Sequence, residues 1–177
     1  MNIHQHTLDY YNAKATEFVS GTINVDFTEI QDAFLELVPK GGNILDFGCG
    51  SGRDTKYFLS KGYEVDAIDG SEEICKIASE YTGISVKQML FEELDVCEKY
   101  DGIWACASIL HVEKNALPSI LRRMQTAIKQ GGIIYTSFKY GNFEGVKNGR
   151  FFTYLMEESL IEILKEIPEL IIEKIWI

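Results

Sequence analysis

The sequence lacks several features that would assign it to a specialised class of protein. None of its apolar runs reaches the roughly 20 residues that cross a bilayer, and no basic region followed by an apolar block opens the chain. We therefore expect a cytoplasmic protein. No internal repeat or linker interrupts the 177 residues, a length that suits one domain with a single core.

Basic residues are also scarce. The chain has 17 Lys and Arg against 27 Asp and Glu, a formal net charge of −10. Clustered Lys and Arg supply most of the non-specific affinity of proteins for nucleic acids. The deficit, together with the absence of an Asn/Asp-Pro-Pro-Tyr segment, argues against a DNA or RNA partner. We expect a small-molecule substrate, and a monomer or homodimer.

Cysteines are few and scattered. Cys49, Cys75, Cys97 and Cys106 form no C-x-x-C pair and have no nearby ladder of histidines, so no zinc or other metal site is predicted. Reduced thiols are expected instead. Cys49 lies near an expected helix start, where a thiol can be activated as a nucleophile. The alternative, which we favour, is a small residue tolerated in a tight turn.

The pattern that is present alternates short apolar strands with helical segments. It predicts an α/β fold, a Rossmann-like doubly wound and mostly parallel sheet with helices on both faces. Apolar residues recur at helical spacing over 117–128, and Gly131 is expected to end that helix as a C-cap. A second helical pattern covers 160–167 and stops at Pro168. Residues 170–177 are expected to form the last strand.

Residues 44–54 are the most informative segment, because they predict a strand, a glycine turn and a helix start. The next expected strand, residues 63–68, is followed by Asp69, at the spacing where an acid meets the ribose hydroxyls of a nucleoside cofactor. The turn is G-x-G-x-G, and Arg53 occupies the place of the third glycine of the dinucleotide motif. A ligand without a pyrophosphate therefore fits better.

Together these residues resemble the class I S-adenosylmethionine-dependent methyltransferases. Residues 100–108 resemble the fourth strand of that family, and residues 129–135 resemble its K-P-G-G turn, with Gln130 in the usual place of proline. Segments 107–112 and 138–153 are similar to small bacterial methyltransferases related to tellurite resistance. The resemblance implies S-adenosylmethionine as cofactor and S-adenosylhomocysteine as product.

The resemblance also implies a cofactor pocket at the strand ends. Its expected members are Asp46, Gly48, Cys49, Gly50, Ser51, Gly52, Arg53, Asp69, Gly70, Ser71, Met89, Leu90, Phe91, Ala107 and Ser108. Asp46 either holds the methionine ammonium through water or pins the glycine turn by accepting backbone amides. The third strand lacks the aspartate that often receives the adenine amino group, so Met89, Leu90 and Phe91 are expected to sandwich the ring.

Two regions are expected within one structural domain. Residues 1–40 form an N-terminal helical lid segment, with helical patterns over 8–19 and 26–38, and residues 41–177 form the methyltransferase core. Tyr11 in the lid is expected at the substrate. Ordinary aromatic packing is the alternative.

The chemistry implied is methyl transfer to an oxygen, nitrogen, sulfur or chalcogen nucleophile of a small molecule. His111 follows the fourth strand and is the candidate general base, with a pKa near 6.5, unless it is a structural histidine. Lys139, Tyr140 and Arg150 follow the fifth strand and are candidates for binding an anionic substrate group, unless they belong to a solvated glycine-rich loop.

The end of the chain departs from the family pattern. Class I methyltransferases close with an antiparallel strand between the fifth and sixth strands, and this sequence stops at Ile177. An exposed sheet edge, a splayed last strand or pairing with another chain is therefore expected. Two other functions are compatible with parts of the sequence. A non-catalytic S-adenosylmethionine or nucleoside-binding protein is the main alternative, and a nicotinamide oxidoreductase is disfavoured by Arg53 and Asp46.

Overall fold

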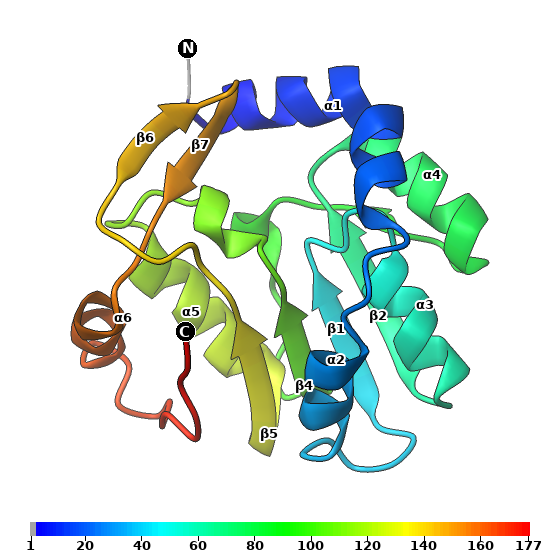
Figure 1. Ribbon diagram of the computed structural model, residues 1–177. Coiled ribbons are helices and arrows are strands. Elements are labelled where there is room, and N and C mark those ends of the chain that lie inside the picture. Colours follow the sequence, from blue (N-terminus) through cyan, green and yellow to red (C-terminus); the bar gives the residue numbers. More distant parts are fainter. Residues whose placement is uncertain (1–2) are drawn as a thin grey trace.

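The computed structural model describes residues 3–177, so the first two residues of the predicted lid segment lie outside the described chain (Figure 1). The main sheet has the order β3-β2-β1-β4-β5. Its strands are β1 (Asn43–Phe47), β2 (Glu64–Asp69), β3 (Lys87–Gln88), β4 (Tyr100–Ala105) and β5 (Ile128–Thr136). The α-helices are α1 (Ile3–Thr22), α2 (Thr28–Leu35), α3 (Arg53–Ser60), α4 (Glu72–Thr82), α5 (Leu117–Ala127) and α6 (Glu157–Leu164). Within the described residues, none of these helices combines the length and apolar character that would let it cross a membrane.

Helices cover both faces of the sheet because its inner strands are apolar on both sides. Leu45 and Phe47 of β1 pack in one buried cluster with α5, whereas Ile44 of β1 and Trp104 of β4 pack with α2 and α3. Every ladder in this sheet is parallel. The predicted Rossmann-like doubly wound architecture is confirmed.

The strand order places a topological switch point at the centre of the sheet. β1 pairs with β2 on one side and with β4 on the other, so the segments that leave β1 and β4 diverge toward opposite faces. Open α/β sheets bind ligands in the crevice outside the carboxyl ends of such strands. In Figure 1, α1 crosses the molecule above these ends.

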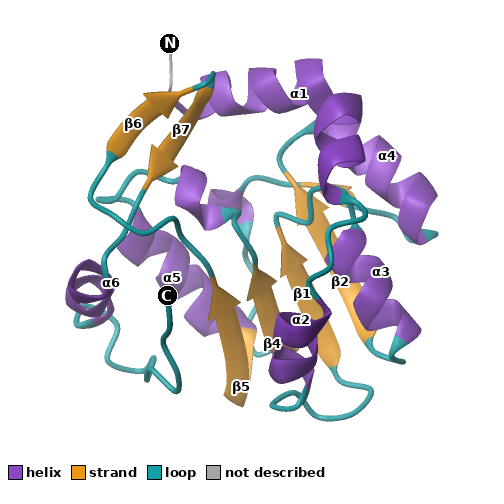
Figure 2. Cartoon of the chain, in the orientation of Figure 1, coloured by secondary structure: helices purple, strands orange, loops and turns teal. Residues whose placement is uncertain are grey.

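A separate antiparallel hairpin follows the sheet, where the sequence suggested only a glycine-rich loop. β6 (Glu144–Lys147) pairs with β7 (Arg150–Thr153), and Asn148 and Gly149 form the turn with φ of 52° and 78°. Positive φ at both central residues is the requirement of a type I′ hairpin, which the Asn-Gly pair meets. Figure 2 shows the hairpin apart from the main sheet, beside the start of α1.

Two expected features are wrong, the C-cap at Gly131 and the last strand. α5 ends at Ala127 and the chain enters β5 at once, so Gly131 is not a C-cap. Gly131 has φ 76° and lies where the β4–β5 register shifts between Tyr100 and Gly102. Residues 170–177 form no strand, and Ile171 and Ile177 are 87% and 80% exposed. An apolar run becomes a strand only when another strand satisfies its backbone, and no strand of the described chain pairs with this segment.

Candidate active site

The glycine turn and the acid after β2 are tied together by hydrogen bonds. Asp69 accepts the backbone N–H of Gly50 at 3.0 Å through Oδ2 and that of Ser71 at 2.9 Å through Oδ1. Burial raises the pKa of Asp69, although backbone amides oppose the rise. Each carboxylate oxygen keeps a lone pair for a further donor. Ser71 caps α4 as expected, since its hydroxyl accepts the N–H of Ile74.

Two glycines of the turn are required by close packing. A Cβ on Gly48 would lie 2.5 Å from the Cβ of Ser108, which is buried and donates its hydroxyl to the carbonyl of Phe47. A Cβ on Gly52 would lie 2.7 Å from Cγ2 of Thr82, at the contact between α3 and α4. Gly52 therefore allows the start of α3 to pack closely against α4. The next residue, Arg53, does not have to be a glycine for this contact.

Asp46 and Arg53 point away from the turn amides. Asp46 is buried and accepts the Thr55 hydroxyl at 2.6 Å, and no turn amide donates to it in the described chain, so the expected pinning role is wrong. Burial and the nearby Asp54 raise the pKa of Asp46. Arg53 forms a two-nitrogen ion pair with Asp54 at 2.8 and 2.9 Å. Asp54, which the sequence analysis passed over, also accepts the indole N–H of Trp104.

The residues expected around adenine split into two groups. Leu90 lies beside Gly70 together with Leu8 of α1, since a Cβ on Gly70 would lie 3.3 Å from Leu90 and 2.8 Å from Leu8. Met89 and Phe91 pack toward the core instead. The three residues therefore do not form a single sandwich.

Cys49, in the turn, is a buried thiol. Burial and the carboxylates of Asp46 and Asp69 raise its pKa well above the ordinary value, which keeps the thiol neutral. The arrangement favours a small packing residue over a nucleophile. Ala107, two residues after β4, is exposed, has φ 48° and donates its N–H to the hydroxyl of Ser137.

Opposite the turn, three segments distant in sequence meet through hydrogen bonds. The hydroxyl of Tyr11 lies 2.9 Å from His111 Nε2, and His111 Nδ1 lies 2.6 Å from the carbonyl of Phe151. Arg150 donates to the Tyr11 oxygen at 3.3 Å. A carbonyl only accepts, so Nδ1 carries the proton and Nε2 accepts the Tyr11 hydroxyl.

Burial and the neighbouring positive charges keep the His111 imidazole neutral. Burial lowers its pKa from 6.5 to about 4, and the positive charges of Arg150 and Lys139 act in the same direction, against the Phe151 carbonyl. The expected pKa near 6.5 is therefore wrong for this environment. Burial raises the pKa of Tyr11, so its phenol is also neutral.

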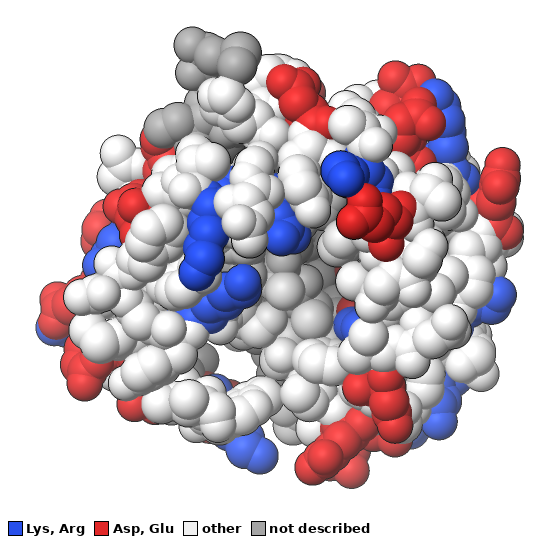
Figure 3. All heavy atoms as spheres, turned by 45° about the horizontal axis from the view of Figure 1, so that its top comes forward, with Lys and Arg blue, Asp and Glu red and all other residues white. Residues whose placement is uncertain are grey.

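Lys139 and Arg150 stand among aromatic rings. The Lys139 ammonium lies 4.6 Å from the ring of Phe152, and the Arg150 guanidinium lies 5.1 Å from that ring and 4.8 Å from the ring of Tyr10. In the described part of the chain no carboxylate pairs with either cation, and the buried Nε of Arg150 has no partner. Tyr140 is 56% exposed and lies outside this group. Figure 3 shows basic side chains beside a hollow in the surface.

Helix α1 links the two sides of the site through two residues that the sequence analysis missed. The Thr7 hydroxyl accepts the N–H of Phe151 at 2.9 Å, and Asn12 accepts the Ser71 hydroxyl at 2.7 Å. The helix kinks at Lys14, where φ is −118°. Five positions separate Thr7 from Asn12, which is not the i, i+3 or i+4 spacing of one helix face, so no periodic pattern in the sequence marks the pair. The role of residues 1–40 as a lid stays a prediction.

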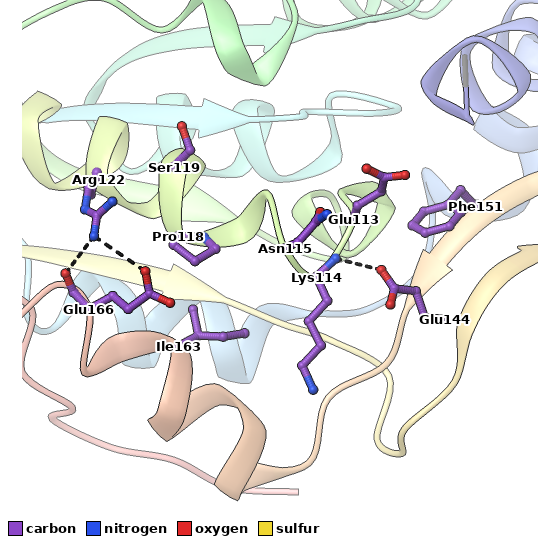
Figure 4. A pocket seen from close by; sticks show the side chains of 10 residues that line it. All are labelled: Glu113, Lys114, Asn115, Pro118, Ser119, Arg122, Glu144, Phe151, Ile163 and Glu166. Atoms are coloured by element: carbon purple, nitrogen blue, oxygen red, sulfur yellow. Dashed lines mark hydrogen bonds and ion pairs between the residues drawn. The ribbon is translucent and has the colours of Figure 1, made fainter. Parts of the chain in front are cut away.

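A second hollow lies elsewhere. An open groove of about 960 Å³ lies between α5, α6 and the hairpin, and Figure 4 shows the side chains that line it. None of the predicted cofactor or substrate residues lines it, and its lining includes the ion pair of Arg122 with Glu166 and the hydrogen bond from the Lys114 backbone amide to Glu144. Among residues 3–177 no three His, Cys, Asp or Glu side chains gather as metal ligands would.

Comparison with known proteins identifies the class. The model of the methyltransferase domain family matches residues 44–132, half of the chain, and the chain belongs to this family. The matched segment contains the glycine turn, Asp69 and His111. The predicted class is confirmed, and the non-catalytic alternative is not favoured.

Particular relatives and structures agree with this assignment. The chain is 28% identical over 133 residues to the probable S-adenosyl-L-methionine-dependent methyltransferase TehB of Haemophilus influenzae, covering 71% of this chain and 46% of the relative. It is 30% identical over 114 residues to the putative methyltransferase YqeM of Bacillus subtilis, covering 58% of this chain and 46% of the relative. The chain thus spans about half the length of these relatives.

Solved structures share the fold. The DhpI complex with SAH superposes with a TM-score of 0.72 at 20% identity, covering 92% of this chain and 86% of that one. The 1,6-didemethyltoxoflavin-N1-methyltransferase of Burkholderia thailandensis gives a TM-score of 0.63 at 23% identity, covering 93% of this chain and 78% of that one.

Proposed function

We propose that the protein transfers a methyl group from S-adenosylmethionine to a small organic acid. The observation that carries the proposal is the pairing of two groups at one sheet edge. The Asp69–Gly50 turn lies on one side, and Tyr11, His111 and Arg150 lie on the other. α1 spans both through Asn12 and Tyr11.

The turn fits the cofactor. Gly50 has φ 53° and carries no side chain on the approach to the turn, and Asp69 keeps lone pairs for two ribose hydroxyls. Gly70, between Leu8 and Leu90, offers an apolar place for adenine. When bound, the cofactor supplies an activated methyl group on a sulfonium. The protein's task is then to hold the acceptor in line with that group and to exclude water.

The acceptor side favours an anion with an apolar body. Lys139 and Arg150 have no neutralising carboxylate in the described chain, and the free Nε of Arg150 allows a two-nitrogen contact with an oxyanion. Tyr10 and Phe152 flank the guanidinium. A flat carboxylic acid fits these groups better than a cation or a sugar.

The experiment is a screen of small acids with a donor labelled in its methyl group, with S-adenosylhomocysteine as the second readout. We expect label transfer to acids, lost in Arg150→Gln and retained in Arg122→Gln, a surface arginine beside Glu166. Transfer only to uncharged or cationic acceptors contradicts the proposed substrate class.

We further propose that the protein works in the cytoplasm on a metabolite and not on a nucleic acid. The net charge of −10 and the four free cysteines support this proposal. A monomer or a homodimer is compatible with the fold, and sedimentation distinguishes the two.

A further inference from the structure

We propose that Tyr11, and not His111, meets the methyl acceptor and takes its proton, passing its own hydroxyl proton to His111 behind it. The inference rests on the proposed function and adds a catalytic residue to it. In this arrangement Tyr11 takes the proton of the methyl acceptor, and His111 takes the proton that Tyr11 releases.

The hydrogen bonds fix the direction of proton transfer. Nδ1 of His111 is committed to the Phe151 carbonyl and Nε2 to the Tyr11 hydroxyl, so neither ring nitrogen is left for an acceptor. The Tyr11 oxygen gives its hydrogen to His111 and accepts one from Arg150, which leaves one lone pair for a donor from the substrate.

The location of Tyr11 suits this task. Its ring packs edge-on against Phe18, with centroids 5.0 Å apart, and Phe18 lies within 3.2 Å of the Cβ position of Gly50. Tyr11 also lies near enough to Asp69 for that carboxylate to raise its pKa. The phenol therefore stands between the cofactor turn and the cationic group.

The step balances with the groups present. The acceptor oxygen bonds to the methyl carbon and displaces sulfur, which keeps the electron pair of the broken carbon–sulfur bond. The acceptor proton moves to the Tyr11 oxygen as the Tyr11 proton moves to His111 Nε2. The positive charge lost at sulfur reappears on the imidazolium, which then releases a proton to water.

An anionic substrate makes this transfer easier. Tyr11, Arg150, Lys139 and the Phe151 carbonyl are the groups that face His111, and the two cations oppose its protonation. A carboxylate bound by Arg150 and Lys139 offsets their charge and raises the proton affinity of the imidazole. Substrate binding thus favours proton transfer from Tyr11 to His111.

The first test needs no turnover. Nitrogen NMR of isotope-labelled protein, with the His111 signals assigned by His111→Gln, reports which ring nitrogen carries hydrogen. We expect protonated Nδ1 and unprotonated Nε2, with the Nε2 signal moving in Tyr11→Phe but not in Tyr57→Phe. Tyr57 also donates one hydroxyl hydrogen bond, to Asp32, on the outer surface. A protonated Nε2 in the wild type overturns the proposal.

The second test compares two acceptors that differ in one atom. meta-Hydroxybenzoate must lose a proton to be methylated at its hydroxyl, whereas meta-mercaptobenzoate is already a thiolate in mildly alkaline buffer. Tyr11→Phe should lower kcat about 100-fold for the hydroxyl acid and less than about threefold for the thiol, with KM nearly unchanged. Equal losses for both acids would show that Tyr11 only positions the substrate.

The two proposals fail in different ways. If the wild type methylates neither acid, the substrate class proposed above is wrong, and the nitrogen spectrum still decides whether the pair is arranged for proton transfer. If both acids are methylated and Tyr11→Phe matches the wild type, methyl transfer stands and the tyrosine relay is wrong.

Discussion

At the scale of single residues, the Asp69 carboxylate shapes the glycine turn by accepting the backbone amides of Gly50 and Ser71. We propose that its remaining lone pairs also accept the ribose hydroxyls of the cofactor. A carboxylate that is already held by its own backbone is pre-organised, because ligand binding does not have to order it.

We predict that Asp69→Ala weakens S-adenosylmethionine binding by more than about tenfold, a loss of about 1.4 kcal/mol, because two ribose contacts are removed and the turn is loosened. Titration calorimetry measures the change. Asp66→Ala is the matched control, since Asp66 lies on the same strand and contacts Lys99 and Tyr100 at the surface. Equal affinity in wild type and Asp69→Ala would remove the ribose assignment.

His111 makes stability depend on pH. Its pKa is about 4 in the folded protein and near 6.5 when unfolded, so both states are neutral above pH 6.5. As the pH falls from 6.5 to 4, the unfolded state takes up a proton first and the folded state loses stability. Urea unfolding should show the wild type losing roughly 1 to 2 kcal/mol more than His111→Gln between pH 7 and pH 5. Parallel losses in the two proteins would contradict the buried neutral imidazole.

The sequence locates some residues of the candidate site but gives no indication of others. Asp69 and the glycines follow from the spacing of strand and turn, because local backbone geometry decides their place. Thr7 and Asn12 do not, because their roles depend on where α1 crosses the sheet. The lowered pKa of His111 comes mainly from burial and in part from the charge of Arg150, 39 positions later in the sequence, and no local pattern predicts these surroundings.

At the scale of elements, the contact between α3 and α4 depends on a glycine. Gly52 and Gly62 both have positive φ, 77° and 85°, but a Cβ would meet Thr82 only at Gly52, whereas the space at Gly62 is open. Comparing alanine substitutions at Gly52 and Gly62 therefore separates the cost of a positive φ from the cost of a steric clash.

We predict that Gly62→Ala lowers the free energy of unfolding by about 1 kcal/mol, the cost of a left-handed alanine. Gly52→Ala should lose at least about 1 kcal/mol more, because α3 and α4 must separate to admit the methyl group. Chemical denaturation of both variants measures the difference. Equal losses would mean that the helices shift freely and that Gly52 is needed only for its φ.

Periodicity predicts buried helices well and isolated pairs of strands poorly. The apolar stripe of α5 is buried at Leu117, Ile120 and Met124, as its spacing predicts, because one face of a helix must pack on the sheet. Residues 170–177 are equally apolar but form no strand, since strand formation requires a partner that the segment itself does not supply. The Asn148-Gly149 pair is a local signal for the hairpin, because both residues tolerate the positive φ that a type I′ turn requires.

At the scale of the whole molecule, the site exists only when distant segments are folded together. Tyr11 and His111 are 100 positions apart, and Tyr11 and Arg150 are 139 apart. The sheet fixes the turn and His111 on one edge, and α1 and the hairpin complete the site from above. Substitutions that remove the contacts of α1 are therefore expected to weaken binding of the proposed methyl acceptor more than they lower the stability of the core.

The central claim is that this edge binds S-adenosylmethionine as a methyl donor, and thermal unfolding with added ligand tests it most directly. A ligand present at 100 times its Kd stabilises the folded state by about 2.7 kcal/mol. We predict that S-adenosylmethionine and S-adenosylhomocysteine each raise Tm, that NAD at the same concentration does not, and that Asp69→Ala abolishes most of the shift. A rise with NAD and none with S-adenosylmethionine would contradict the account.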